Sequence, residues 1–146
     1  MNCSSKNGRY KSTVDIYNNA SQVLTSTPSP LTLVGTVVTN TGIALDPKTS
    51  AIEVTYPGTF LVSVDVIFTA TTAGQVTLQL YNDSVALPET VRTITVPVGT
   101  SKISTSTIRR FVPNCKNPIS IQVYANTDGT AVGNITLIDS KAVKLG

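Results

Sequence analysis

Residues Ala51–Phe68 read AIEVTYPGTFLVSVDVIF, and this stretch decides the fold. In its second half, Phe60–Phe68, apolar residues occupy every second position, and Ser63 and Asp65 lie between them. A period of two residues is typical of a β-strand that buries one face. The Pro-Gly pair in front of this half predicts a turn, so the stretch contains two strands joined by a turn.

The rest of the chain repeats this pattern in shorter segments, separated by turns rich in Gly, Pro, Asn and Ser. The last segment, 132–143, is predicted as a strand with Ile135 and Leu137 on one face and Thr136 and Ile138 on the other. No long segment has the 3.6-residue apolar period of a helix. The sequence therefore predicts an all-β fold, a two-sheet antiparallel jelly-roll sandwich of about nine or ten short strands. An immunoglobulin sandwich is the alternative, but the chain has no Trp for such a core.

The length of 146 residues fits one domain. We expect that domain at residues 13–146, preceded by a polar, extended N-terminal arm at residues 1–12. The candidate attachment residues of the arm are Lys6, Arg9, Tyr10 and Lys11. Two alternatives are open: the arm is disordered, or it becomes ordered on a neighbouring subunit or a larger assembly.

The net charge of +3 comes from eleven Lys and Arg residues scattered along the chain, against eight acidic residues. A diffuse charge of this size is typical of a solvated surface, so we expect no nucleic-acid partner. Cys3 in the arm and Cys115 in a turn are expected as free thiols, and a chain without His lacks the usual zinc ligands. We therefore expect no metal and no cofactor. Because no apolar run is long enough to cross a bilayer and no secretory signal is visible, we expect a chain made in the host cytoplasm, with no membrane partner.

The residue types present give little support for catalysis. The chain has no His, its acidic residues lie mostly in turns, and neither a Gly-rich phosphate loop nor a nucleophile elbow is found. Asp65 is the one carboxylate in the middle of the strongest strand, and we expect it to face solvent or an interface and to hydrogen bond to neighbouring hydroxyls. Asn82 and Asn134 fit the glycosylation pattern but are expected as turn and strand residues. We therefore predict a protein that is not an enzyme.

Four segments share their order and spacing with a known family. They are Ile52–Val64, Val76–Asn82, Ile119–Tyr124 and Ile135–Ile138. In the first, a strand ends in a short turn with Gly, an aromatic residue follows two positions later, and a long alternating strand begins. This pattern resembles the tumour necrosis factor and complement globular-head superfamily over residues 43–139. The resemblance implies a jelly roll and a compact homotrimer, in which outward-facing residues of one sheet pack around a three-fold axis.

Tyr81 and Tyr124 have the opposite parity to the apolar rows beside them, so both rings are predicted to lie outside the core. Together with Gln79 and Gln122 they are the predicted trimer interface, because Tyr combines a large contact area with a polar tip. The alternative is a pair of ordinary half-exposed tyrosines.

The resemblance, the polar arm and the lack of catalytic groups favour a structural protein of a virus particle. We expect a trimeric capsid decoration or head-fibre protein of a bacteriophage virion, attached by its arm to other virion proteins such as the major capsid protein. The alternative is a receptor- or glycan-binding surface module, either a phage receptor-binding tip or a bacterial or spore surface protein. Its expected partner is a host surface glycan or protein, held by the loops Asn82–Ser84 and Asp128–Gly129.

Overall fold

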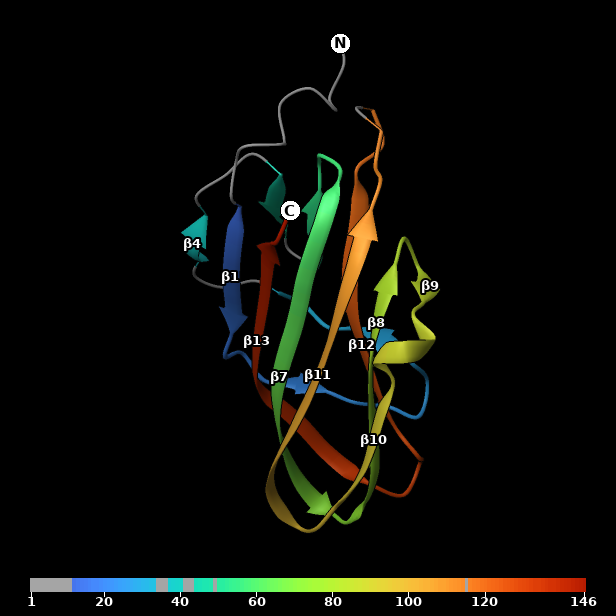
Figure 1. Cartoon of the computed structure of the whole chain (residues 1–146). Helices are drawn as coiled ribbons and strands as arrows, with labels where there is room; N and C mark the ends of the chain where they lie inside the picture. Colours follow the sequence, from blue (N-terminus) through green and yellow to red (C-terminus); the bar gives the residue numbers. More distant parts are fainter. Residues whose placement is uncertain (1–11, 34–36, 41–43, 49, 115) are drawn as a thin grey trace.

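The computed structural model describes residues 12–33, 37–40, 44–48, 50–114 and 116–146. These residues form two antiparallel β-sheets that pack face to face, with one 3-10 turn at Pro88–Thr90 (Figure 1). The predicted all-β sandwich is therefore confirmed. The described residues contain thirteen strands rather than nine or ten, because several segments of two or three residues also pair.

Sheet A has six strands. In spatial order they are β11 (Gly99–Phe111), β7 (Gly58–Thr72), β13 (Val132–Lys144), β1 (Thr13–Asn18) and β4 (Val37–Asn40), with β2 (Gln22–Val23) paired to β13. The strand β7, which contains the second half of the stretch that decides the fold, lies between β11 and β13 and pairs with both over most of its length.

Sheet B has seven strands. In spatial order they are β10 (Arg92–Val96), β8 (Gly74–Asn82), β12 (Ile119–Thr127), β6 (Ile52–Val54) and β5 (Leu45–Pro47), with β3 (Ser29–Pro30) paired to β12 and β9 (Val85–Ala86) paired to β8. Long strands that follow one another along the chain change sheets, as β7 to β8 and β11 to β12 to β13 do, which is the connectivity of a jelly roll. β10 lies at the end of the sheet, and Pro97, which has no N–H to donate, follows it directly.

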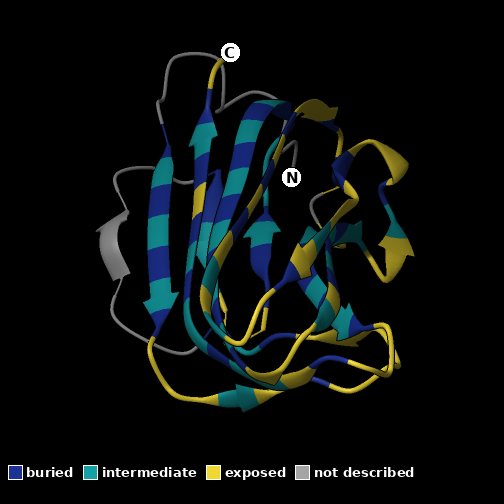
Figure 2. Cartoon of the chain, turned by 90° about the horizontal axis from the view of Figure 1, so that it is seen from below, coloured by how far each residue is buried: buried dark blue, intermediate teal, exposed yellow. Residues whose placement is uncertain are grey.

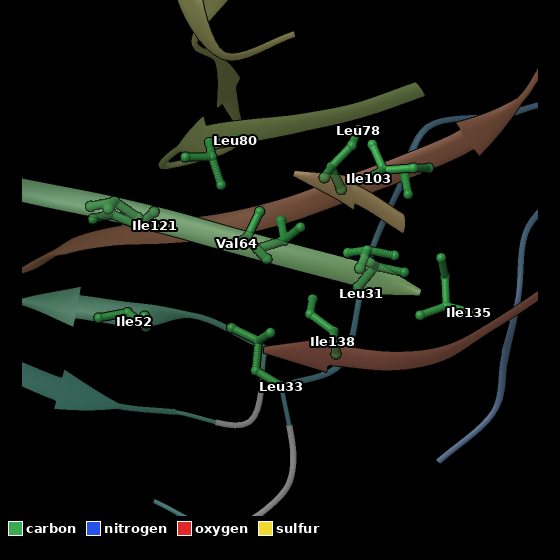
Figure 3. Packing of buried hydrophobic residues seen from close by; sticks show 14 of the residues in the cluster. Leu31, Leu33, Ile52, Val64, Leu78, Leu80, Ile103, Ile121, Ile135 and Ile138 are labelled. Carbon is green, nitrogen blue, oxygen red and sulfur yellow. The ribbon is translucent and has the colours of Figure 1, made fainter. Parts of the chain in front are cut away.

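The core lies between the two sheets and is built by alternate residues of each strand. On β7 every second residue from Gly58 to Ala70 is buried, and the residues between them are half-buried, which Figure 2 shows as alternating bands. Figure 3 shows Val64 and Ile138 of sheet A facing Leu78 of sheet B across this core. The sequence period therefore decides which face of each strand is buried.

Thr90 completes the edge of sheet B between β9 and β10. Both strands pair with β8, but neither reaches Leu80. The Thr90 hydroxyl, which is fully buried, accepts a hydrogen bond from the Leu80 N–H at 2.9 Å and donates one to the Leu87 carbonyl at 2.7 Å. The Thr90 carbonyl in turn accepts from the Thr105 hydroxyl of sheet A. A side chain thus supplies the acceptor that a paired strand would otherwise provide.

The last strand differs from the sequence prediction. Ile135 and Ile138 are both fully buried, whereas Leu137 is half-buried on the outer face. The cause is a β-bulge, because the pairing of β13 with β7 shifts between Ile135 and Leu137 and leaves Thr136 without an opposite residue. The prediction that Ile135 and Leu137 share a face, opposite Thr136 and Ile138, is therefore wrong.

Candidate functional surfaces

Tyr81 and Tyr124 lie on the outer face of sheet B, as their parity predicts. Leu80 and Val123 beside them are buried, while both tyrosines are half-buried. Tyr81 is opposite Gln122 and Tyr124 is opposite Gln79, so the two rings are diagonal neighbours on β8 and β12. Their ring centroids are 3.7 Å apart with 12° between the planes, which is a stacked pair.

The two glutamines tie this pair to the β8–β9 hairpin. Gln79 Nε2 donates to the Leu87 carbonyl at 3.2 Å, and Gln122 Oε1 accepts from the Ser84 N–H at 3.2 Å. The hairpin turn is tight, with positive φ at Asp83 and Ser84. The structure therefore brings Tyr81, Tyr124, Gln79 and Gln122 into one group, and their role as a subunit interface stays a prediction.

Five large aliphatic side chains lie on the opposite side of the sandwich, on the outer face of sheet A. Ile108, Leu61 and Val143 are in register across β11, β7 and β13, and Ile67 and Leu137 are in register further along. Ile108 is 65% exposed and the other four are half-buried. The described residues place no strand over this face. Sequence reasoning missed this aliphatic surface, although Leu61 and Ile67 have the same parity on β7 as Ser63 and Asp65 and so point outward with them.

An acidic patch, Asp15, Asp65, Asp139 and Lys141, lies between these two aliphatic groups. Asp139 is opposite Asp65 on β7, and Lys141 is opposite Asp15 on β1. Lys141 Nζ is 3.0 Å from Asp139 Oδ2 and 3.8 Å from Asp15 Oδ2. Asp65 Oδ1 accepts a hydrogen bond of 2.5 Å from the Ser104 hydroxyl, which confirms the expected contact with a neighbouring hydroxyl.

The two carboxyls of Asp15 and Asp139 are electrostatically coupled. Burial, the hydrogen bond to Asp139 and the negative charge of Asp139 raise the pKa of Asp15 to about 6. Burial alone would raise the pKa of Asp139 as well, but the hydrogen bond from Asp15 and the contacts with Lys141 lower it. Asp15 therefore holds its proton to a higher pH than an ordinary carboxyl does, and Asp139 stays charged.

The two predicted ligand-binding loops lie at opposite ends of the β8–β12 pair. The Asp83 N–H donates to the Ser120 carbonyl, and the Asp128 N–H donates to the Gln75 carbonyl at the other end. Within the second loop, two backbone N–H groups hydrogen bond to the Asp128 carboxylate, which lowers its pKa. The structure therefore does not bring these loops into one site.

Two hollows open on the described surface. One, of about 300 Å³, lies where β2 meets the bulged part of β13, and Val23 and Val132 line it with neighbouring hydroxyl residues. The other, of about 250 Å³, extends from Asp65 across β11 to Arg92 of the neighbouring edge strand, and three serines line it. The second hollow joins the acidic patch to a guanidinium from sheet B.

The predicted attachment arm lies almost entirely outside the described residues. This applies to Cys3, Lys6, Arg9, Tyr10 and Lys11, and also to Cys115 in its loop. Ser12 is described, and it is buried, with its carbonyl accepting a hydrogen bond of 2.8 Å from the Lys144 N–H. Ser12, which the sequence prediction assigns to the arm, therefore hydrogen bonds to β13, and the division into arm and domain stays a prediction.

In the part of the chain that the structure describes, no group of three or more His, Cys, Asp or Glu residues lies close enough to hold a metal ion. Across the same residues, no helix has the length and apolar character to span a membrane.

Comparison with known proteins shows similarity at the level of structure. No protein-family profile and no curated protein sequence matches this chain. PRD1 vertex protein P5 matches with a TM-score of 0.64 and 16% identity, over 92% of this chain and 97% of that chain. Murine APRIL at pH 5.0 matches with a TM-score of 0.62 and 14% identity, over 93% of this chain and 100% of that chain. The globular domain of zebrafish complement 1qA matches with a TM-score of 0.61 and 13% identity, over 93% of this chain and 97% of that chain. The chain therefore has the jelly-roll fold shared by tumour necrosis factor-like and complement globular-head proteins.

Proposed function

We propose that the chain is a non-enzymatic structural protein of a virus particle, a trimeric capsid decoration or head-fibre protein of a bacteriophage. The observation that carries the proposal is the fold shared with PRD1 vertex protein P5 over nearly the whole of both chains. A vertex is a feature of an icosahedral shell, which supports a virion location. The lack of His in the chain agrees with a role in assembly rather than acid-base chemistry.

The trimer is supported by the family resemblance and by the surfaces of the sandwich. The three-fold axis of such a trimer could lie along either of two outer faces, which are on opposite sides of the sandwich. The outer face of sheet A has five aliphatic side chains that no described strand covers. On sheet B, in contrast, the rings of Tyr81 and Tyr124 are already stacked on each other. Burial of apolar area drives association, so we place the axis along sheet A. The predicted interface at Tyr81, Tyr124, Gln79 and Gln122 is the competing arrangement.

A matched pair of variants tests the trimer and its face. Native mass spectrometry of the wild type is expected to give three times the 15.4 kDa mass of the chain. Leu61→Lys is expected to give a folded monomer, because three ammonium groups would meet near the axis, and Tyr124→Lys is expected to stay trimeric. The opposite result would move the axis to the tyrosine face. A wild type that is monomeric at micromolar concentration would contradict the trimer itself.

The arm is proposed to attach the trimer to other virion proteins, with the major capsid protein as its partner. Lys6, Arg9, Tyr10 and Lys11 are its proposed contact residues. Deletion of residues 1–11 tests this, because the deletion keeps Ser12 and its hydrogen bond to the domain. The truncated chain is expected to fold and to trimerise but not to be incorporated into particles. Normal incorporation would contradict the role of the arm.

The stacked tyrosines favour one second function, that of a receptor- or glycan-binding module on a virion tip or on a bacterial or spore surface. With the axis along sheet A, the Tyr81–Tyr124 pair and its flanking amides face away from the trimer. Aromatic rings beside amide groups are suited to the apolar and hydroxyl faces of a sugar. Saturable binding on a glycan array that is lost in Tyr124→Ala would support this function. If no glycan on the array binds saturably, the binding function is contradicted and only the structural role remains.

A further inference from the structure

Asp15 and Asp139 form a carboxyl pair whose geometry calls for one proton. Their side chains are only 19% and 29% exposed. Oδ1 of each is buried, and in the charged form neither oxygen has a donor among the described residues. A proton on Asp15 supplies the donor that these buried oxygens lack, and the raised pKa of Asp15 beside the lowered pKa of Asp139 agrees with this arrangement.

The charged groups around this pair come from β13, β7, β11 and β10. β13 contributes Lys141, which contacts both carboxyls, and β7 contributes Asp65 opposite Asp139. β11 contributes Lys102, with its Nζ 4.0 Å from Asp65, and Arg92 of β10 lines the hollow beside Asp65. Tyr17 of β1 is opposite Asp139, and β4 has no ionisable residue in its sequence.

The charge of the sheet A face therefore changes with one proton. When Asp15 is charged, the two carboxylates of Asp15 and Asp139 share the one ammonium group of Lys141, which leaves one negative charge in this cluster. When Asp15 is neutral, the charges of Asp139 and Lys141 balance, and Asp65 has a cation of its own in Lys102. In a three-fold assembly along this face, the excess charge is repeated three times near the axis, and burying an unbalanced charge opposes association.

We propose that the Asp15–Asp139 pair makes self-association through the outer face of sheet A proton-linked, so that the trimer tightens as the pH falls. The inference rests on the proposed trimer and adds its regulation. The aliphatic groups on both sides of the pair provide the apolar contact, and the carboxyl pair sets the pH at which that contact forms.

Sedimentation equilibrium of the full chain at pH 5 and pH 8 tests the linkage. The wild-type trimer is expected to dissociate at a concentration at least about tenfold higher at pH 8. Asp15→Asn keeps a donor for Asp139 and removes the titrating proton, so it is expected to be equally tight at both pH values. Asp46→Asn, on the outer face of sheet B opposite Glu53, is the matched control and is expected to behave as the wild type does.

The outcomes separate this inference from the proposed function. A wild-type trimer of equal strength at both pH values, or an Asp15→Asn trimer that remains pH-dependent, would overturn the inference and leave the trimer intact. No trimer at either pH would overturn both. Carbon NMR titration of the Asp15 carboxyl gives a reading that does not depend on assembly. A midpoint near the pKa of about 6 supports the pair, and one near the model-peptide value of about 3.9 overturns it.

Discussion

Replacing Thr90 with Val is expected to lower the free energy of unfolding by about 2 kcal/mol. Val has nearly the shape of Thr, so the fully buried site keeps its packing and loses only the hydroxyl. The Leu87 carbonyl retains a second donor, the Thr90 N–H at 3.0 Å, and the Leu80 carbonyl retains the Leu87 N–H at 2.9 Å. The Leu80 N–H, in contrast, loses its acceptor. One buried donor without a partner costs about 1–3 kcal/mol, which gives the expected magnitude.

Urea unfolding followed by far-UV circular dichroism measures this loss at one fixed protein concentration. With a slope of about 2 kcal/mol per molar urea, the midpoint is expected to fall by about 1 M. Thr90→Ser is the matched control, because it keeps the hydroxyl and removes a methyl group, and its loss is expected to be about half as large. If Thr90→Val unfolds within about 0.5 kcal/mol of the wild type, the hydroxyl does not complete the sheet edge.

Gly133→Ala is expected to destabilise by about 3 kcal/mol or more, because a Cβ there would lie 2.1 Å from the Thr69 carbonyl oxygen; a smaller loss in thermal unfolding would show that β13 can shift. Asp15→Asn is expected to stabilise the monomer at pH 7.5 by about 1 kcal/mol after allowance for solvent screening. Because the pKa of Asp15 is raised in the folded wild type, the wild type loses stability as the pH rises from 3.8 to about 6. The stability gain of the variant over the wild type should therefore vanish near pH 4 in urea titrations. A gain that does not depend on pH would contradict the raised pKa. A double-mutant cycle of Tyr81→Ala and Tyr124→Ala is expected to give a coupling of about 1 kcal/mol, and additive losses would argue against stacking.

The strand faces could be predicted from the sequence because burial follows a two-residue period. The alternation in Phe60–Phe68 identifies the buried face of β7, and parity alone places Tyr81 and Tyr124 outside the core. The Thr136 bulge reverses the parity of the last strand, and nothing in the local sequence marks it. A bulge depends on how β13 meets β7, which is nearly seventy residues earlier in the chain.

The candidate surfaces were predictable only in part. The stacking of Tyr81 on Tyr124 depends on the register between β8 and β12, which period alone does not define. The acidic patch requires β1, β7 and β13 to be neighbours, and that order is a property of the whole jelly roll. The outward aliphatic residues Leu61 and Ile67 were visible in the sequence, but their continuation onto Val143 was not.

The stacked tyrosine pair also gives the molecule a built-in optical reporter. The chain has no Trp and five Tyr, so its near-ultraviolet signal comes almost entirely from phenol rings. Two rings 3.7 Å apart and nearly parallel share their electronic excitations, whereas an isolated ring does not. A ligand or neighbour that wedges these rings apart should therefore change the near-ultraviolet dichroism without any label, and binding at the distant face of sheet A should leave that band unaltered.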